Sequence, residues 1–131
     1  MMLKVFVVED SPAQCAYLTQ ILTTEAKVVI VGIAATETQA VRWLESHPDQ
    51  WDIALVDLFL GEGSGVGVIR HCQNRRPDQS VVVMTNHARN DHLLHHCETL
   101  GVDAVYHKAT ELYSLVAYCK SMAAKRPQYA A

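Results

Sequence analysis

The stretch DIALVD, residues 52–57, decides the fold of this chain, because four consecutive apolar residues stand between two aspartates. A short run without polar positions is typical of a strand that is buried on both faces of a parallel sheet. A second such run, Val5 to Val8, ends in the acidic pair Glu9 and Asp10. The carboxyl ends of parallel strands meet at one edge of the sheet, where such folds bind ligands. We therefore expect Glu9, Asp10 and Asp57 to share one site.

These three carboxylates, called the acidic cluster below, also indicate what that site binds. Clustered carboxylates repel one another unless a hard cation lies among them. The cation that such oxygen ligands suit best is Mg2+, so the sequence predicts a magnesium site at this edge of the sheet.

Five apolar runs alternate with five segments of helical periodicity along the chain. This alternation predicts an α/β fold with a parallel sheet between layers of helices. Ser11 and Pro12 mark the start of the first helix, Arg76-Pro77-Asp78 the end of the third, and Gly101 the end of the fourth. The predicted strands are Leu3–Val8, Val28–Ala34, Ile53–Val56, Ser80–Thr85 and Ala104–His107.

The composition narrows the class of protein. A length of 131 residues predicts one domain, and 50% hydrophobic with 19% charged residues is typical of a soluble protein. No apolar stretch approaches the ~20 residues of a membrane span, and the first residues lack the pattern of a signal peptide, which favours the cytoplasm. A net charge of −3 with only short basic spots argues against direct binding to nucleic acid.

The four cysteines lie far apart in segments of helical periodicity. Their spacing matches neither a metal knuckle nor a short disulfide framework. We expect reduced, half-buried core thiols at Cys15, Cys72, Cys97 and Cys119.

Five separated positions follow one another in order along the chain: the acidic pair Glu9-Asp10, then Asp57, Gly65, Thr85 and Lys108. Gly65 lies in the loop after Asp57, and the others lie at or just after the ends of predicted strands. In this arrangement the chain resembles the receiver domains of two-component response regulators, including the free-standing chemotaxis type. The resemblance covers residues 1–125 as a single domain and leaves 126–131 as a short disordered tail. It implies the flavodoxin-like fold, a doubly wound, five-stranded parallel sheet of order 2-1-3-4-5 in a (βα)5 chain.

The resemblance implies that Asp57 is the nucleophile that accepts a phosphoryl group from a phosphohistidine of a sensor histidine kinase. The implied ligands of Mg2+ are Glu9, Asp10, Asp57 and the backbone carbonyl of Phe59. The metal would neutralise the charge on the phosphoryl oxygens during transfer. Such a protein is a phosphoacceptor that assists its own phosphorylation and dephosphorylation, and is not an enzyme with an external substrate.

The same resemblance gives Lys108 and Thr85 separate roles. Lys108 would supply a fixed positive charge to the phosphoryl group, and Thr85 a hydroxyl hydrogen bond. Inward movement of Thr85 would then change the face formed by the fourth helix, fifth strand and fifth helix. The expected partners are a sensor histidine kinase or phosphotransfer protein, and a second copy of the chain bound through that face, with no nucleic acid and no membrane.

The chain departs from the common receiver pattern at its switch. Val105 occupies the position three before Lys108 that usually carries an aromatic residue, and Tyr106 follows one position later. A step of one residue along a strand sends the side chain to the other face, so Tyr106 is not expected to inherit the switch. Glycines at 61, 63, 65 and 67 predict an unusually flexible loop after Asp57.

Three further side chains are expected to tune the lifetime of the phosphorylated state. Phe59 stands two residues after Asp57, and His87 two residues after Thr85. An apolar Phe59 would shield the acyl phosphate, whereas His87 would orient a water molecule and speed hydrolysis. Asn86, where receivers commonly have a smaller residue, would narrow the access of phosphodonors.

Other functions remain open at this point. These residues could be the excised N-terminal domain of a DNA-binding transcription regulator instead of a free-standing receiver. A hydrolase of the aspartyl-phosphate type shares the nucleophile, but Phe59 stands where its general acid would follow Asp57. A degenerate receiver that binds partners without phosphorylation is disfavoured by the intact set of five positions.

Overall fold

A computed structural model of the protein describes residues 2–86 and 90–125, in which five strands alternate with five helices. The strands have the bounds that the apolar runs predict. They are β1 (Leu3–Val8), β2 (Val28–Ala34), β3 (Ile53–Val56), β4 (Ser80–Thr85) and β5 (Ala104–His107). The helices are α1 (Pro12–Glu25), α2 (Glu37–Ser46), α3 (Gly65–His71), α4 (Asp91–Thr99) and α5 (Leu112–Ala124).

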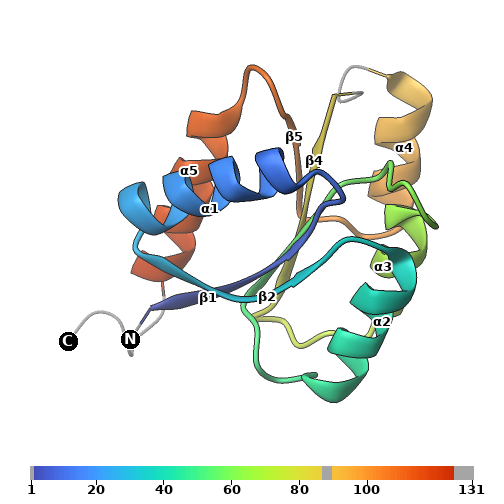
Figure 1. The fold of residues 1–131 in the computed structure, drawn as a ribbon, viewed down its shortest axis with the longest axis horizontal. Coiled ribbons are helices and arrows are strands. Elements are labelled where there is room, and N and C mark those ends of the chain that lie inside the picture. The colour runs from blue at the N-terminus through green and yellow to red at the C-terminus, as the bar shows by residue number, and fades with distance from the viewer. Residues whose placement is uncertain (1, 87–89, 126–131) are drawn as a thin grey trace.

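The strands form one parallel sheet of order β2-β1-β3-β4-β5, which confirms the predicted topology. Helices α1 and α5 cover one face of the sheet, and α2, α3 and α4 cover the other (Figure 1). The chain leaves β1 toward one side of the sheet and β3 toward the other. Loops that diverge in this way open a crevice at the carboxyl edge, where doubly wound folds bind their ligands.

Each face of the sheet has its own apolar core because side chains alternate along a strand. Phe6 and Val8 pack toward α2, α3 and α4, whereas Val5 and Val7 pack toward α1 and α5. Every position of β3 is buried. Burial on both faces explains why this strand is apolar throughout, and burial of each such side chain is worth about 1.5–3 kcal/mol.

Trp43 holds α2 against the sheet. Its ring stacks on Phe6 with centroids 4.1 Å apart, and His47 stacks on its other side at 4.4 Å. Gly32 of β2 lies against the same indole, because a Cβ at this position would stand 2.5 Å from Trp43 Nε1. Only glycine lets the helix approach this closely.

The predicted start of α1 and the predicted end of α4 are confirmed, but the predicted end of α3 is not. Ser11, Thr36 and Asn90 cap α1, α2 and α4 with side-chain oxygens, and Gly101 adopts φ +76° after α4. Within residues 2–86 and 90–125, no helix is long and apolar enough to cross a membrane.

The predicted end of the third helix at Arg76-Pro77-Asp78 is wrong, since α3 ends at His71. The guanidinium of Arg75 donates hydrogen bonds to the carbonyl oxygens of Cys72 at 3.0 Å and Gly101 at 2.6 Å. These bonds satisfy a carbonyl at the helix end and tie the chain to the segment after α4. A carbonyl at the end of α3 is thus satisfied by a side chain that also bonds to a residue distant in sequence.

The four cysteines are free thiols, and they are more deeply buried than predicted, with at most 7% of each residue exposed. Burial raises the pKa of Cys72 to about 11 and that of Cys119 to about 12. These groups therefore remain protonated core residues at neutral pH.

Candidate functional site

The acidic cluster and its neighbours meet at the carboxyl edge of the sheet. Glu9 and Asp10 directly follow β1, Asp57 follows β3, Thr85 ends β4, and Lys108 follows β5. Four adjacent strands thus deliver one or more polar side chains each to a cavity of about 200 Å3. The cavity is lined by Glu9, Asp10, Ser11, Gln14, Asp57, Phe59, Thr85, Asn86 and Lys108.

The carboxylates of the acidic cluster offer oxygen atoms that all lie within 4.8 Å of one another. Glu9 and Asp57 are buried, whereas Asp10 is exposed. Asp10 Oδ2 accepts a hydrogen bond from the Gly61 N–H at 2.8 Å, so the loop after Asp57 is attached to the end of β1. The arrangement is suited to a hard cation with oxygen ligands.

Lys108 lies between two of these carboxylates. Its Nζ is 2.8 Å from Asp57 Oδ2 and 2.5 Å from Glu9 Oε1. Burial by itself would lower the pKa of Lys108, but the hydrogen bonds to Asp57 and Glu9 outweigh it and raise that pKa above the ordinary 10.5. Lys108 is therefore a fixed cation beside Asp57, and its role toward a phosphoryl group stays a prediction.

The backbone around Asp57 is packed tightly on α3. Asp57 Oδ1 accepts a hydrogen bond from the Phe59 N–H at 3.2 Å. A Cβ on Gly65 would overlap the carbonyl oxygen of Asp57, so the first turn of α3 requires glycine here. Gly65 belongs to the five positions of the resemblance, and this close approach gives it a physical reason.

The side chains expected to respond to a bound group differ in exposure. Thr85 is fully buried beneath the cavity, whereas Asn86 is exposed at its rim. Phe59 also lines the cavity but is 55% exposed, so it covers only one side of the site. His87 lies outside the described residues.

Val105 and Tyr106 point to opposite faces of the sheet. Val105 packs with the core beneath α2, α3 and α4, and Tyr106 with the core beneath α1 and α5. The Tyr106 ring makes an edge-to-face contact with Tyr118 of α5, with centroids 6.3 Å apart. Tyr106 therefore does not occupy the place of an aromatic residue three positions before Lys108.

Three residues that belong to or support this site were not among the predicted site residues. Ser11 and Gln14 line the cavity from the first turn of α1, and the Ser11 N–H donates to Glu9 Oε2 at 3.1 Å. Their positions just after the acidic pair were the available signal. Glu37 accepts a hydrogen bond from the Ser64 N–H at 2.8 Å and has no such local signal.

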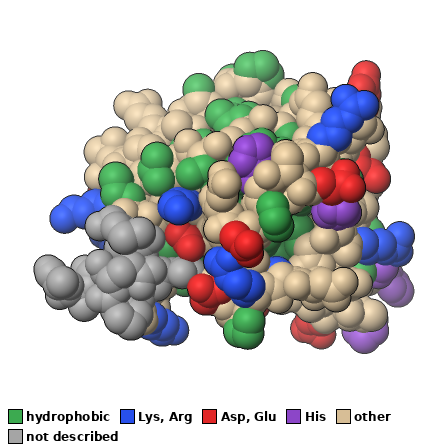
Figure 2. Space-filling view, turned by 90° about the horizontal axis from the view of Figure 1, so that it is seen from below, with side chains coloured by type: hydrophobic (Ala, Val, Ile, Leu, Met, Phe, Trp, Pro, Cys, Tyr) green, Lys and Arg blue, Asp and Glu red, His purple; other side chains and the backbone are tan. Residues whose placement is uncertain are grey.

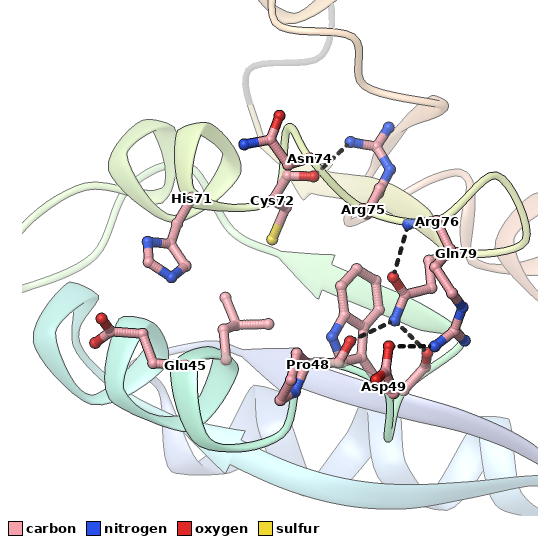
Figure 3. Close-up of a pocket in the computed structure, with 11 residues that line it drawn as sticks. Glu45, Pro48, Asp49, His71, Cys72, Asn74, Arg75, Arg76 and Gln79 are labelled. Atoms are coloured by element: carbon pink, nitrogen blue, oxygen red, sulfur yellow. Dashed lines mark hydrogen bonds and ion pairs between the residues drawn. The ribbon is translucent and has the colours of Figure 1, made fainter.

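A second cavity, of about 250 Å3, lies at the amino edge of the sheet between α2 and the segment after α3 (Figure 3). Buried Gln79 donates to the carbonyl oxygens of Pro48 and Trp51, both at 3.0 Å, and accepts from the Arg76 N–H at 3.1 Å. Arg76 also pairs with Asp49 at 2.6 Å. The view from below shows basic and acidic side chains intermixed (Figure 2). This end is built from mutually satisfied groups, which indicates a structural role.

The chain matches a known protein family. The sequence profile of the response regulator receiver domain matches residues 5–120. The match spans most of the chain, including the ends of the four strands that form the cavity. This protein belongs to the response regulator receiver domain family, which acts in two-component signalling.

Two curated bacterial proteins are similar to it. The uncharacterized transcriptional regulatory protein YhcZ of Bacillus subtilis is 27% identical over 114 residues, which is 87% of this chain and 52% of YhcZ. The DNA-binding transcriptional activator DevR/DosR of Mycobacterium tuberculosis is 28% identical over 94 residues, 71% of this chain and 42% of that protein. The chain thus spans about half the length of these curated relatives.

Solved structures share the fold. A CheX-CheY-BeF3-Mg2+ complex from Borrelia burgdorferi matches with a TM-score of 0.80 and 22% identity, covering 91% of this chain and 87% of that chain. The response regulator domain of Thermotoga maritima CheB matches with a TM-score of 0.81 and 15% identity, covering 97% and 100%.

Proposed function

We propose that this protein is a phosphoacceptor that takes a phosphoryl group on Asp57 in a Mg2+-dependent reaction and thereby changes its affinity for a partner. The observation that carries the proposal is the position of Asp57. Its carboxylate lies 2.8 Å from Lys108 Nζ and within the acidic cluster, at the edge where the four strands end. A buried nucleophile beside both a fixed cation and a set of metal ligands is suited to phosphoryl transfer.

The donor set fits Mg2+. The proposed ligands are the acidic cluster and the backbone carbonyl of Phe59, all oxygen atoms. Among the residues that the structure describes, three carboxylates face one ammonium here, which leaves negative charge for a cation to balance. When bound, Mg2+ supplies positive charge that stabilises the phosphoryl oxygens during transfer. The structural relative from Borrelia burgdorferi holds BeF3 and Mg2+, which supports this assignment.

In the proposed reaction, a carboxylate oxygen of Asp57 attacks the phosphorus of a phosphohistidine. The P–N bond breaks as the new P–O bond forms, and the electron pair leaves with the imidazole of the donor. Lys108, released from its pair with Asp57, holds the transferred group by charge, and Thr85 donates its hydroxyl hydrogen bond. Later attack by water on phosphorus breaks the P–O bond, returns the Asp57 carboxylate and releases inorganic phosphate.

The output is proposed to be a change of protein contact through the face formed by α4, β5 and α5. The donor partner is a sensor histidine kinase or a phosphotransfer protein in the cytoplasm of a bacterium, and a second copy of the chain is a further partner for this face. Residues 1–125 would form the complete receiver unit. Since Val105 replaces the usual aromatic residue, the movement of Thr85 must reach α4 by another contact.

The curated relatives favour a second candidate. Both are transcriptional regulators, and the chain spans about half of each. These residues could therefore act as the receiver of a longer transcription regulator, in which phosphorylation of Asp57 controls an attached DNA-binding domain. Reading the full coding frame decides between this candidate and a free-standing receiver.

The test is phosphorylation by acetyl phosphate with and without Mg2+, followed by intact mass. We expect one phosphoryl adduct that requires Mg2+ and is absent from Asp57→Asn. Asp52→Asn is the matched control, because Asp52 flanks the other end of β3 and accepts a hydrogen bond from the Lys4 N–H at 2.7 Å. An adduct that persists in Asp57→Asn would contradict the proposal, as would failure of both acetyl phosphate and an active histidine kinase.

A further inference from the structure

Glu37 is the first residue of α2, yet its carboxylate contacts the loop between β3 and α3. Glu37 Oε1 accepts a hydrogen bond from the Ser64 N–H at 2.8 Å, and the Glu37 N–H donates to the carbonyl oxygen of Glu62 at 3.2 Å. Two bonds thus attach α2 to the end of this loop. Ser64 also caps α3, so the carboxylate lies near the positive end of that helix.

Two glycines make room for this carboxylate. A Cβ on Gly67 would overlap Glu37 Oε2, and a Cβ on Gly63 would overlap Glu37 Cβ. Gly67 lies inside α3, where alanine would ordinarily favour the helix. The number of glycines predicts a flexible loop. The contacts show instead that Gly63 and Gly67 both pack against the Glu37 side chain.

The segment fixed in this way leads directly to the acidic cluster. Phe59 and Ser64 form an antiparallel bridge that closes the base of the loop. Between them, the Gly61 N–H donates to Asp10 Oδ2 at 2.8 Å. A shift of Ser64 would therefore move the Phe59 backbone and the Gly61 amide relative to Asp10.

We infer that Glu37 is a positioning residue for the proposed metal and phosphoryl site, and that it acts through Ser64 on the backbone of Phe59 and Gly61. This inference rests on the proposed function and extends it to a residue outside the cavity. Groups that orient metal ligands from behind typically change metal affinity by 10–100-fold when removed. Glu37 holds a ligand-bearing loop in this manner, although it touches neither the metal nor the phosphoryl group.

The first test compares Glu37→Ala, Glu37→Gln and the wild type by calorimetric titration with Mg2+ and by amide hydrogen exchange. We expect Glu37→Ala to weaken Mg2+ binding about tenfold and to speed exchange of the Ser64 and Gly61 amides. Glu37→Gln keeps an acceptor oxygen and should restore most of both properties. Glu45→Ala is the matched control, because Glu45 is an exposed acid on the same helix.

If Glu37 only stabilised the fold, any variant of similar stability would weaken Mg2+ binding equally. Ile53→Val removes one methylene from the buried far end of β3 and lowers stability without touching the loop. If Ile53→Val weakened Mg2+ binding as much as Glu37→Ala, the loss would reflect general destabilisation and the inference would be overturned. Unchanged Mg2+ affinity in Glu37→Ala would also overturn it.

A double-mutant cycle tests independently whether the Glu37 carboxylate, in the space beside Gly67, supports Mg2+ binding. Gly67→Ala should displace the Glu37 carboxylate and weaken Mg2+ binding about as much as Glu37→Ala does. In the Glu37→Ala background the same substitution should have no further effect, because the space is already empty. Losses that add in the double variant would overturn the inference.

The two proposals can fail separately. If the wild type accepts no phosphoryl group, the proposed function fails, but amide exchange still reports whether Glu37 positions the loop. Faster exchange of the Gly61 amide in Glu37→Ala supports the positioning role under either result. Unchanged exchange of that amide overturns it.

Discussion

At the carboxyl edge of the sheet, within residues 2–86 and 90–125, the three carboxylates of the acidic cluster face one ammonium, that of Lys108. At the amino edge, in contrast, opposite charges pair with each other. Arg76 lies between Asp49 and Asp78, and Arg75 pairs with Asp103. The first group is largely buried, and the Arg76 pairs are largely exposed. Ionic interactions between the same kinds of residue therefore contribute very different free energies to folding at the two edges.

This difference between the two edges shows where polar groups are satisfied within the protein and where a ligand is needed to satisfy them. At the amino edge, buried Gln79 has protein partners for both its amide oxygen and its amide nitrogen. At the carboxyl edge, the protein gathers like charges that repel one another and buries two of them. An arrangement that is unfavourable alone becomes favourable when a cation or a phosphoryl group completes it.

The largest contrast is expected between Lys108→Ala and Arg76→Ala. Removal of Lys108 leaves two buried carboxylates without their cation and should lower the free energy of unfolding by about 3 kcal/mol. Removal of Arg76 from its exposed pairs should cost below about 1 kcal/mol. Urea denaturation of both variants at low ionic strength measures the contrast, and equal losses would show that the edges do not differ.

Mg2+ should act at one edge alone. At a free concentration ten times its Kd, it should raise the free energy of unfolding by about 1.4 kcal/mol. Asp10→Asn should abolish this gain while making the metal-free protein slightly more stable, because it removes one like charge. Arg76→Ala should retain the full gain. Thermal unfolding with and without Mg2+ would show the opposite pattern if the metal bound at the amino edge.

The pH dependence should come from Lys108. Burial opposes its charge, but the bonds to Asp57 and Glu9 raise the pKa of Lys108 above its ordinary value. Its stabilising contribution is therefore fully present below the unfolded pKa of about 10.4 and is lost as pH rises through the folded pKa. Unfolding of the wild type and Lys108→Met should differ most near neutral pH and converge above that folded pKa. A constant difference would contradict the assignment.

The smallest expected effect concerns the lifetime of the phosphorylated state. Phe59 covers one side of the cavity, so Phe59→Asn should admit water and speed decay a few-fold. His87→Ala should slow decay if that imidazole orients the attacking water. Loss of the phosphoryl adduct over time measures both, and no change in either variant would dismiss the tuning hypothesis.

Local patterns were sufficient to predict the sheet. Charged or turn residues bound the apolar runs and so mark the strand ends. The clearest case is β3, where burial on both faces leaves no polar position inside the strand. The strand ends in turn predicted that Glu9, Asp10 and Asp57 lie together, because parallel strands deliver their carboxyl ends to one edge. Lys108 and Thr85 were added to these acids by the resemblance to receiver domains, and their roles toward a phosphoryl group stay predictions.

Long-range contacts were not visible in the sequence. Arg75, just after α3, bonds to Gly101, and Glu37 bonds to Ser64 at a separation of 27 residues. A lone glutamate at a helix start ordinarily indicates favourable helix electrostatics. Likewise, the glycines after Asp57 predicted flexibility, because the sequence does not show that the Glu37 side chain fills the space beside Gly63 and Gly67.

The contact between Gly32 and Trp43 has a spectroscopic consequence. An α-proton of Gly32 points at the indole of Trp43, so the aromatic ring current should shift its resonance upfield, away from the other glycine signals. Trp43 belongs to α2, the helix that begins at Glu37. One resolved line in a proton spectrum would therefore report whether α2 remains docked in any variant.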